Sequence, residues 1–405
     1  MTSPPHWLAI LGIGEDGVEG MTPAARTLLG AAEVVYGGER HLALARDLIR
    51  GEARPWPTPM TQAFPALVAL RPRPVAVLAS GDPFCYGVGA RLAHLVPANE
   101  MLCLPVPSAY SLACARLGWS LVDVTTLSLC GRPLATLIPH LQPGARLLVL
   151  SADGATPAAV ADLLHARGFG ESRLHVMEAL GGPRERVRTL AATDWIPGDI
   201  DPLNLLAIEL KATADALVLP LASGLADEFF EHDGQLTKQE VRAVTLAVLA
   251  PLQGELLWDV GAGSGSIGIE WLLCHRANRA IAIERRAERA ARAARNAAAL
   301  GVPRLAMVEG AAPDALAGLP PPDAAFIGGG AERPGVVEAV WDALRPGGRL
   351  VANAVTIETE SVLFASCQRW GGTLRRIAVE RLDALGTMHG FRPAMTVTQW
   401  AASKR

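Results

Sequence analysis

Four glycines within eight residues mark the stretch of this chain with the clearest chemical signature. The segment Leu256–Glu270 reads LLWDVGAGSGSIGIE, an apolar strand to Asp259 followed by a loop with glycine at 261, 263, 265 and 268. Such glycines let the backbone turn sharply and let a ligand come within contact distance. A helix expected to begin near Ile267 would offer unpaired N–H groups and the positive end of its dipole. We therefore expect a nucleotide-type pocket at the carboxyl end of a parallel strand.

Two ligands compete for this loop. The segment Gly263–Gly268 satisfies GxGxxG, a pattern of dinucleotide-binding folds. The longer pattern Asp259–Gly265, D-x-G-x-G-x-G, resembles the loop that binds S-adenosylmethionine (SAM) in class I methyltransferases. Glu284, expected at the end of the next strand, lies 19 residues after Gly265 and could accept hydrogen bonds from the ribose hydroxyls of either ligand. The pattern favours SAM, and an NAD-dependent oxidoreductase remains the alternative.

The bulk composition narrows the classes of function. The 405 residues are enough for two or three domains, and 50% hydrophobic with 19% charged residues predicts a packed core. The net charge of −3, without a basic block, disfavours nucleic acid as the main partner. Six cysteines without CxxC spacing indicate reduced thiols and no metal site. Since we find neither a secretory signal nor a membrane-length apolar run, we expect a cytoplasmic protein without membrane contact.

Apolar strands alternate with helices through the first half of the chain. Thr22 is expected to cap a helix that begins at Pro23. The expected strands are Trp7–Leu11, Val34–Tyr36, Pro74–Ala79, Leu102–Val106, Leu127–Cys130, Arg146–Leu150, Leu174–Glu178 and Leu205–Leu210, and the further helices are Leu112–Trp119, Leu134–Leu141 and Pro157–Ala166. This alternation predicts a mainly parallel α/β architecture.

The second half repeats the alternation after a candidate linker. Lys211–Gly224 is poor in charge and ends in Ser-Gly, so we expect domains at 1–211 and 225–405 joined by a linker at 212–224. Thr237 and Glu240 form a capping-box pattern at the start of a helix Lys238–Leu249. The other expected elements are a helix Arg285–Leu300, parallel strands Leu256–Asp259, Arg279–Glu284, Leu305–Val308, Asp323–Ile327 and Arg349–Val355, and a final antiparallel pair Thr373–Arg381 and Met395–Trp400.

Three turns in the first half resemble those of the tetrapyrrole methylases. They are Gly12–Gly17, the G-D-P loop Gly81–Pro83, and Pro105–Gly118. The resemblance implies an N-terminal two-lobed fold with SAM in the cleft between its lobes. It places the SAM contacts at Ser80, Gly81, Asp82, Cys85, Ser108 and Ala109. One departure is that the family's G-x-G-P-G-D turn reads GIGEDG here, as in the subgroup acting late in corrin synthesis.

The second half resembles the decarboxylating methyltransferases of corrin biosynthesis, which have a Rossmann-like class I fold. The resemblance rests on Leu236–Arg242, on the glycine loop Asp259–Gly265, and on Glu309–Leu316. It implies SAM contacts at Thr237, Gly261, Ala262, Gly263, Ser264, Gly265, Glu284, Gly310 and Ala311. Ala311 departs from the acidic residue that faces the adenine in many class I enzymes.

Together the two halves resemble the two-domain methyltransferases of the cobalamin pathway. The resemblance implies a reduced precorrin as substrate, methylated at C5 by the first domain and at C15 by the second. It also implies loss of CO2 from the C12 acetate in the second domain, one SAM per domain, and a homo-oligomer.

Methyl transfer is a direct displacement that needs alignment more than acid–base groups, so the lack of a Ser/His/Asp constellation is no objection. The segment Gly328–Gly330 would leave space for a broad, flat ligand. His389 lies in a glycine-flanked loop and is a candidate for proton handling, beside a surface or packing role. Arg184, Arg186 and Arg188 would share one face of a strand and could bind substrate carboxylates or form a solvated edge.

Overall fold

The structure, a computed structural model, describes residues 6–195 and 198–405, which form two compact units. The first unit holds the described residues up to Leu134 and those of Gln142–Leu217, and the second holds Ala135–Leu141 and Val218–Arg405. The chain passes between the units after Leu134, after Leu141 and after Leu217. The short segment Ala135–Leu141, which the sequence reading placed in the first domain, groups with the second unit. In the described residues, no helix combines the length and apolarity needed to cross a membrane.

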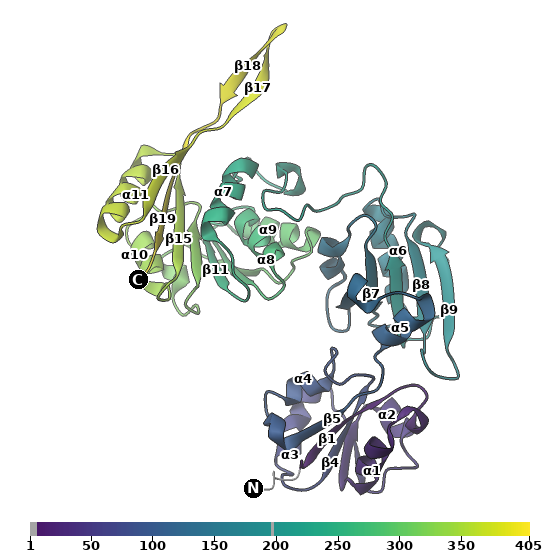
Figure 1. The fold of residues 1–405 in the computed structure, drawn as a ribbon. Helices are drawn as coiled ribbons and strands as arrows, with labels where there is room; N and C mark the ends of the chain where they lie inside the picture. Colours follow the sequence, from purple (N-terminus) through teal and green to yellow (C-terminus); the bar gives the residue numbers. More distant parts are fainter. Residues whose placement is uncertain (1–5, 196–197) are drawn as a thin grey trace. The chain divides into compact units, whose positions relative to one another are not determined.

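The first unit begins with a five-stranded parallel sheet in the order β3-β2-β4-β1-β5 (Figure 1). Its elements are β1 (Leu8–Ile13), α1 (Pro23–Ala31), β2 (Val34–Gly37), α2 (Glu39–Leu44), β3 (Glu52–Pro55), α3 (Phe64–Val68), β4 (Val75–Ser80), α4 (Val88–Leu92) and β5 (Met101–Leu104). All six residues of β1 are buried, with alternate side chains packed into cores on the two faces. The Thr22 hydroxyl accepts the Ala25 N–H, which confirms the predicted N-cap of α1. β3 was missed because it is short and polar.

The second sheet of this unit differs from the predicted parallel arrangement. Its elements are α5 (Ala109–Leu117), β6 (Thr125–Ser128), β7 (Arg146–Leu150), α6 (Thr156–Ala166), β8 (Arg173–Glu178), β9 (Arg186–Ala191) and β10 (Asn204–Glu209). The 3-10 helix η5 (Leu134–His140) lies between β6 and β7 in the chain and groups with the second unit from Ala135 on. In the order β6-β7-β10-β8-β9, only β6 and β7 are parallel neighbours. Helix α6 does connect two parallel strands, but β10 returns between them in the opposite direction. The expectation of a mainly parallel architecture is therefore wrong for this sheet.

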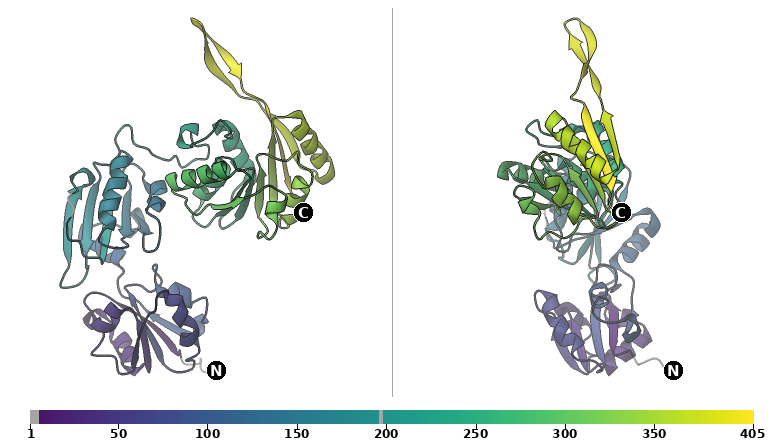
Figure 2. Two further views of the ribbon diagram at one scale, coloured as in Figure 1. Left: turned by 180° about the vertical axis from the view of Figure 1, so that it is seen from behind. Right: turned by 90° about the vertical axis from the view of Figure 1, so that its left-hand side faces the viewer.

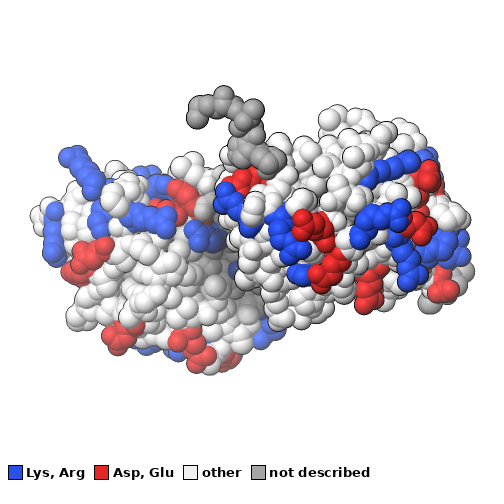
Figure 3. Space-filling view, turned by 90° about the horizontal axis from the view of Figure 1, so that it is seen from below, with Lys and Arg blue, Asp and Glu red and all other residues white. Residues whose placement is uncertain are grey.

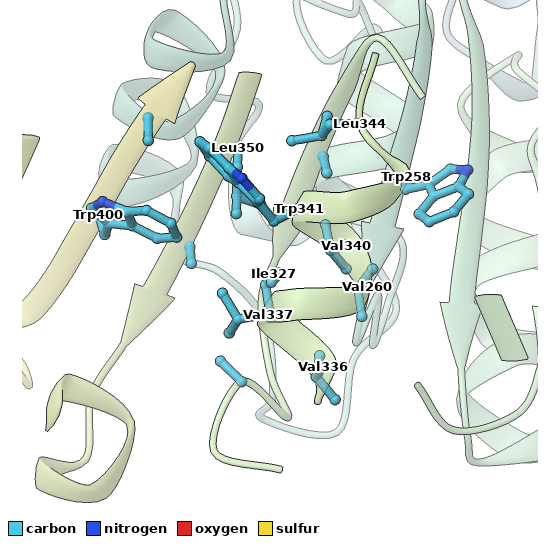
Figure 4. Close-up of a cluster of buried hydrophobic side chains, with 14 of the residues drawn as sticks. Trp258, Val260, Ile327, Val336, Val337, Val340, Trp341, Leu344, Leu350 and Trp400 are labelled. Atoms are coloured by element: carbon cyan, nitrogen blue, oxygen red, sulfur yellow. The ribbon is translucent and has the colours of Figure 1, made fainter. Parts of the chain in front are cut away.

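The second unit is built on a seven-stranded sheet in the order β13-β12-β11-β14-β15-β19-β16. Its elements are α7 (Gln239–Leu249), β11 (Leu256–Val260), α8 (Ser266–Cys274), β12 (Arg279–Glu284), α9 (Ala287–Ala299), β13 (Ala306–Glu309), β14 (Ala324–Ile327), α10 (Val336–Ala343), β15 (Arg349–Ala354), α11 (Ile357–Trp370), β16 (Thr373–Ile377), β17 (Glu380–Leu385), β18 (Met388–Pro393) and β19 (Val397–Ser403). β11 to β15 are parallel, and β19 pairs antiparallel with β15 and β16, as predicted. Figure 4 shows α10 packing on this sheet through Val337, Val340 and Trp341. The fold class is thus a two-lobed α/β unit followed by a Rossmann-like α/β unit.

Between β16 and β19 the chain forms a hairpin that was not predicted: the expected strand Thr373–Arg381 spans β16 and the start of β17, and the expected loop around His389 is strand β18. β16 ends at Ile377, and β17 and β18 then pair with each other outside the main sheet. Figure 2 shows this hairpin extending beyond the sheet that carries it. Most of its residues are exposed, so no buried face marked it in the sequence.

Charged side chains of both signs are interspersed over the surface drawn in Figure 3. This distribution is in keeping with the small net charge of −3.

A buried arginine fixes the entry into the second unit. Arg242 on α7 is 0% exposed and binds the carboxylate of Glu270 on α8, which is 2% exposed. Its guanidinium also donates to the carbonyls of Leu225 and Thr237. The Glu270 carboxylate accepts in addition the backbone N–H groups of Gly224 and Leu225. This network ties the segment before α7 to the core of the unit.

The capping box predicted at Thr237 is wrong. Helix α7 starts one residue later, with Lys238 as its N-cap and no side-chain cap hydrogen bond. Glu240 binds Arg381 instead of closing a box, and the Thr237 carbonyl is held by Arg242. These two arginine contacts, and not a capping box, therefore hold the start of α7.

We predict that Arg242→Leu lowers the free energy of unfolding of the second unit by about 3–5 kcal/mol, because it leaves the Glu270 carboxylate buried without its partner. Arg369→Ala serves as the control, since Arg369 pairs with Glu338 at 3.8 Å and both side chains are at least half exposed. That change should cost less than about 1 kcal/mol. Guanidinium titrations followed by circular dichroism measure both values, and equal costs for the two variants would contradict the assigned role of Arg242.

Candidate functional site

Two buried carboxylates hold the glycine loop that follows β11. Asp259 is 1% exposed, and its Oδ2 accepts the N–H of Gly268 at 2.9 Å. Glu284, at the end of β12 as predicted, is 5% exposed, and its Oε2 accepts the N–H of Gly263 at 2.9 Å. Both carboxylates therefore act on the loop backbone, one in the first turn of α8 and one at the loop's centre.

The loop also packs directly against the chain after β14. Gly261 has φ +72°, a left-handed conformation, and a Cβ there would lie 2.6 Å from the carbonyl oxygen of Gly329. Only glycine satisfies both the angle and this close approach. The glycines after two neighbouring strands thus bring two loops into contact at the carboxyl edge of the sheet.

A cavity of about 530 Å³ opens over this edge of the sheet. The segment Gly234–Lys238 and the ends of β11, β12, β13 and β14 contribute to its lining, together with Asn353 and the base of the β17–β18 hairpin. Of the residues proposed from sequence, the lining includes Thr237, Gly261, Ala262, Gly263, Ser264, Glu284, Gly310 and Ala311. Gly265 lies outside the lining and serves as the N-cap of α8 with φ +78°. The volume is in the range of small-molecule sites.

Several lining residues were missed from sequence. Asn353, near the end of β15, donates to the Thr245 hydroxyl at 3.1 Å and accepts from Gln399 at 3.0 Å. Arg333 and Arg381 also line the cavity, from the chain after Gly328–Gly330 and from the start of β17. Asn353 and Arg333 could have been predicted as site residues because both lie near the ends of expected strands. No local pattern marked Arg381.

Burial changes the protonation of Asp259. Its desolvation raises the pKa of the carboxyl group from 3.8 to about 7, the Gly268 N–H opposes this rise, and the charge of Glu284 adds to it. A carboxyl group that titrates near neutral pH at the floor of a cavity is typical of a functional site.

The remaining candidates of the sequence reading lie elsewhere. His389 is exposed on β18 and is absent from the cavity lining. Arg186 and Arg188 both bind the Glu178 carboxylate, which is 1% exposed, and Arg184 pairs with Glu15 and Asp201. These three arginines are therefore engaged in ion pairs within the first unit. Their geometry corresponds to neither a free anion-binding face nor a purely solvated edge.

In the first unit, the predicted loops meet at the carboxyl end of β1. A Cβ on Gly12 would lie 2.1 Å from the carbonyl oxygen of Gly81 and 2.6 Å from the N of Val106. The backbone N–H of Gly81 donates to Ile13, and that of Val106 donates to Gly81. The loops after β4 and β5 are thus joined across the end of β1, the strand that lies between them.

The polar groups of these loops are mostly oriented by their own turns. Asp82 accepts the N–H of Phe84 at 2.8 Å, and its carbonyl accepts the N–H of Cys85. Burial, with the charge of Asp82, raises the pKa of the Cys85 thiol. Ser108 is the N-cap of α5 and accepts the N–H of Ser111, and Ala109 is the first residue of that helix. The six proposed residues therefore come from two adjoining loops.

Arg40 and His41 belong to this site but were missed from sequence. Arg40 donates to the Ser80 hydroxyl at 2.9 Å and binds the Glu15 carboxylate, and His41 Nε2 lies 2.8 Å from the same hydroxyl. Burial, reinforced by the charge of Arg40, lowers the pKa of His41 to about 4, so its imidazole is neutral at pH 7. The Gly37–Gly38 turn after β2 was the available signal.

We predict that Asp259→Asn changes how stability depends on pH. Because the folded pKa of about 7 exceeds the ordinary 3.8, Asp259 favours the folded state below about pH 4, and this contribution is lost as the pH rises through 7. The wild-type chain should therefore lose a few kcal/mol relative to the Asn variant between pH 4.5 and about 7.5. Denaturant titrations across this range measure the difference, and a constant difference at every pH would refute the shifted pKa.

Two family models match the chain and together cover most of it. Residues 8–194 match the tetrapyrrole (corrin/porphyrin) methylases, and residues 228–404 match a precorrin methyltransferase domain. These matches favour a methyl donor for the glycine loop over the dinucleotide alternative.

Curated relatives match the chain too, one of them over nearly its full length. The chain is 56% identical to the precorrin-6Y C(5,15)-methyltransferase (decarboxylating) of Sinorhizobium sp, over 98% of this chain and 96% of that protein. It is 39% identical to "Probable cobalt-precorrin-6B C(15)-methyltransferase (decarboxylating)" of Pyrobaculum calidifontis, covering 34% of this chain and 72% of that protein. It is 30% identical to the cobalt-precorrin-7 C(5)-methyltransferase of Salmonella typhimurium, covering 47% of this chain and 90% of that protein. The chain belongs to the family of decarboxylating precorrin-6Y C(5,15)-methyltransferases.

Proposed function

We propose that this chain methylates precorrin-6Y at C5 and C15 and removes CO2 from the C12 acetate, giving precorrin-8X with SAM as the methyl donor. The observation that carries the proposal is the cavity over the glycine loop, whose lining joins Glu284 and Gly310 to the segment Gly328–Gly330. Full-length similarity to a relative named for both methylations supports the two-domain form of the reaction.

The residues of the second unit fit one SAM. Each carboxylate oxygen of Glu284 already accepts one backbone N–H, and each keeps a further acceptor position for a ribose hydroxyl. Gly261 has a left-handed backbone conformation and no side chain that would collide with Gly329. Ala311 lines the cavity but has no polar side chain, so backbone groups would have to bind the adenine. SAM bound there would supply an electrophilic methyl group on a sulfonium for transfer to a nucleophilic ring carbon.

The chain's own contribution to methyl transfer is alignment and exclusion of water. Gly328 to Gly330 carry no side chains, so a flat ring can approach the glycine loop closely. Asn353 offers a polar group that Thr245 and Gln399 hold in one orientation. In the decarboxylation, CO2 leaves, the electron pair of the broken carbon–carbon bond enters the conjugated ring, and the remaining methylene takes up one proton to become a methyl group. These residues need to hold the ring in place during this step.

We assign C5 methylation to the first unit and C15 methylation with decarboxylation to the second, each with its own SAM. In the first unit, the joined loops that carry Gly81 and Ser108 lie at the carboxyl edge of a parallel sheet, the usual ligand side. Separate relatives named for C5 methylation and for C15 methylation with decarboxylation support this division.

Product analysis with one variant in each unit tests the division. We predict that Asp82→Ala abolishes methylation at C5 because it breaks the turn to Phe84, and that Glu284→Ala abolishes methylation at C15 because it releases Gly263 and the ribose. Glu338→Ala removes a half-exposed carboxylate outside both sites and should leave both methyl groups. Mass spectrometry and NMR of the product assign each methyl. Loss of the same methyl in both variants would refute the division of labour.

A second prediction concerns Gly261. Gly261→Ala should weaken S-adenosylhomocysteine binding in the second unit at least about tenfold, since it combines left-handed strain with a collision against Gly329. Gly318→Ala is the matched control: its φ is +77°, but nothing lies within 4 Å of the added Cβ. Titration calorimetry compares the two variants, and equal weakening would show that backbone strain alone is responsible.

We also propose that the chain forms a homo-oligomer. On the β17–β18 hairpin, Leu382, Met388 and Phe391 are 62%, 73% and 70% exposed, which favours burial against another copy. Replacing all three with Ser should lower the molar mass measured by light scattering, while an unchanged mass would contradict a role for the hairpin.

A further inference from the structure

Five basic side chains line the cavity of the second unit, and most of them are neutralised by an acidic partner. They are Lys238, Arg285, Arg289, Arg333 and Arg381. Lys238 lies 3.4 Å from Asp227, Arg289 lies 2.8 Å from Asp233, and Arg381 lies 2.6 Å from Glu240. Within residues 6–195 and 198–405, Arg285 and Arg333 form neither an ion pair nor a side-chain hydrogen bond. These two cations are available to a ligand.

The two free arginines lie on opposite sides of β11. Arg285 is exposed and directly follows Glu284 at the end of β12. It therefore lies on the side of β11 where Glu284 is proposed to bind the ribose of SAM. Arg333 follows β14, which pairs with the other edge of β11. Only Arg333 therefore lies on the half of the sheet edge left for the methyl acceptor.

The backbone around Arg333 is fixed although its guanidinium is free. Ala331, two residues before Arg333, is 1% exposed, and Val336 at the start of α10 is 0% exposed. The Arg333 N–H donates to the Gly330 carbonyl at 3.1 Å, and Gly328 donates to Val260 at 2.9 Å. Because this segment is held against the glycine loop, little conformational entropy of the backbone is lost when the side chain binds a ligand.

We propose that Arg333 is a positioning residue that binds a side-chain carboxylate of the tetrapyrrole and so orients the ring over the donor loop of the second unit. This inference rests on the proposed function. A guanidinium binds a carboxylate through two parallel N–H donors, which fixes orientation as well as position. A precorrin presents its carboxylates around the rim of a flat ring, so one such bond selects which edge of the ring faces Gly328–Gly330.

The bound carboxylate is one that the product retains. An ion pair with the acetate that leaves as CO2 would stabilise its carboxylate in the ground state and oppose its loss. Arg333 therefore binds an acetate or propionate neighbouring the reacting group, and the reacting carboxylate stays free of this cation.

The test compares Arg333→Ala and Arg333→Lys with Arg375→Ala in the full chain. Arg375 is exposed on β16, outside this cavity, and removal of its side chain deletes the same charge from the same unit. The readouts are CO2 released from substrate labelled in the C12 acetate carboxyl, S-adenosylhomocysteine affinity by calorimetry, and quenching of uroporphyrin fluorescence as a measure of equilibrium binding.

For Arg333→Ala we expect the KM of CO2 release to rise about 10- to 100-fold, the loss typical of a charged hydrogen-bonded pair. Arg333→Lys should recover part of this loss, Arg375→Ala should match the wild type, and S-adenosylhomocysteine affinity should stay within about twofold in all three. Uroporphyrin binding should weaken most in Arg333→Ala and less in Arg333→Lys, and it should be unchanged in Arg375→Ala.

Three results would overturn the proposal. Weakened S-adenosylhomocysteine affinity with an unchanged KM would assign Arg333 to the carboxylate of the methyl donor. Equal effects of Arg333→Ala and Arg375→Ala would reduce its role to the overall charge of the unit. If the wild type releases no CO2, the proposed function fails by itself, and uroporphyrin binding that does not distinguish the variants would then reject the Arg333 site separately.

Discussion

The site in the second unit depends on two carboxylates that are removed from water and bound to backbone N–H groups. Asp259 lies one residue before the end of β11 and Glu284 ends the neighbouring parallel strand β12, so both side chains reach the same loop. An acceptor buried without a donor is costly, and therefore each carboxylate favours the one loop conformation that supplies its N–H group. Gly261 can then turn into the left-handed region and lie against Gly329. The shape of the cavity follows from these contacts.

A further buried carboxylate holds another part of the cavity lining, the segment before α7. Glu270 is buried with Arg242, and their shared contacts with backbone groups fix the chain before α7, including the Thr237 carbonyl. The first unit uses close backbone approach instead, since Gly12 allows the loops after two other strands to touch over the end of β1. Both units thus place glycines and short polar side chains at the carboxyl edge of a parallel sheet, where ligands of such folds bind.

The sequence predicted the features that depend on local pattern and strand order. The strand–loop–helix at Leu256–Glu270, the place of Glu284 and the closing antiparallel pair are confirmed. It could not predict features set by contacts between distant residues. Thr237 fitted a capping box, but Arg381, 141 residues from Glu240, competes for the acidic partner. Arg333 lacks an ion-pair partner because the acidic residues around the cavity pair with other basic side chains, which the sequence does not reveal. The antiparallel position of β10 between β7 and β8 depends on strand pairing that has no local sequence signal.

The central claim is that one chain holds two separate sites for the same methyl donor. Titration calorimetry of the full chain with S-adenosylhomocysteine tests it most directly. The account predicts two molecules bound per chain, falling to one when Glu284 is replaced with Ala and to one when Asp82 is replaced with Ala. A single molecule bound per wild-type chain at saturation would contradict it.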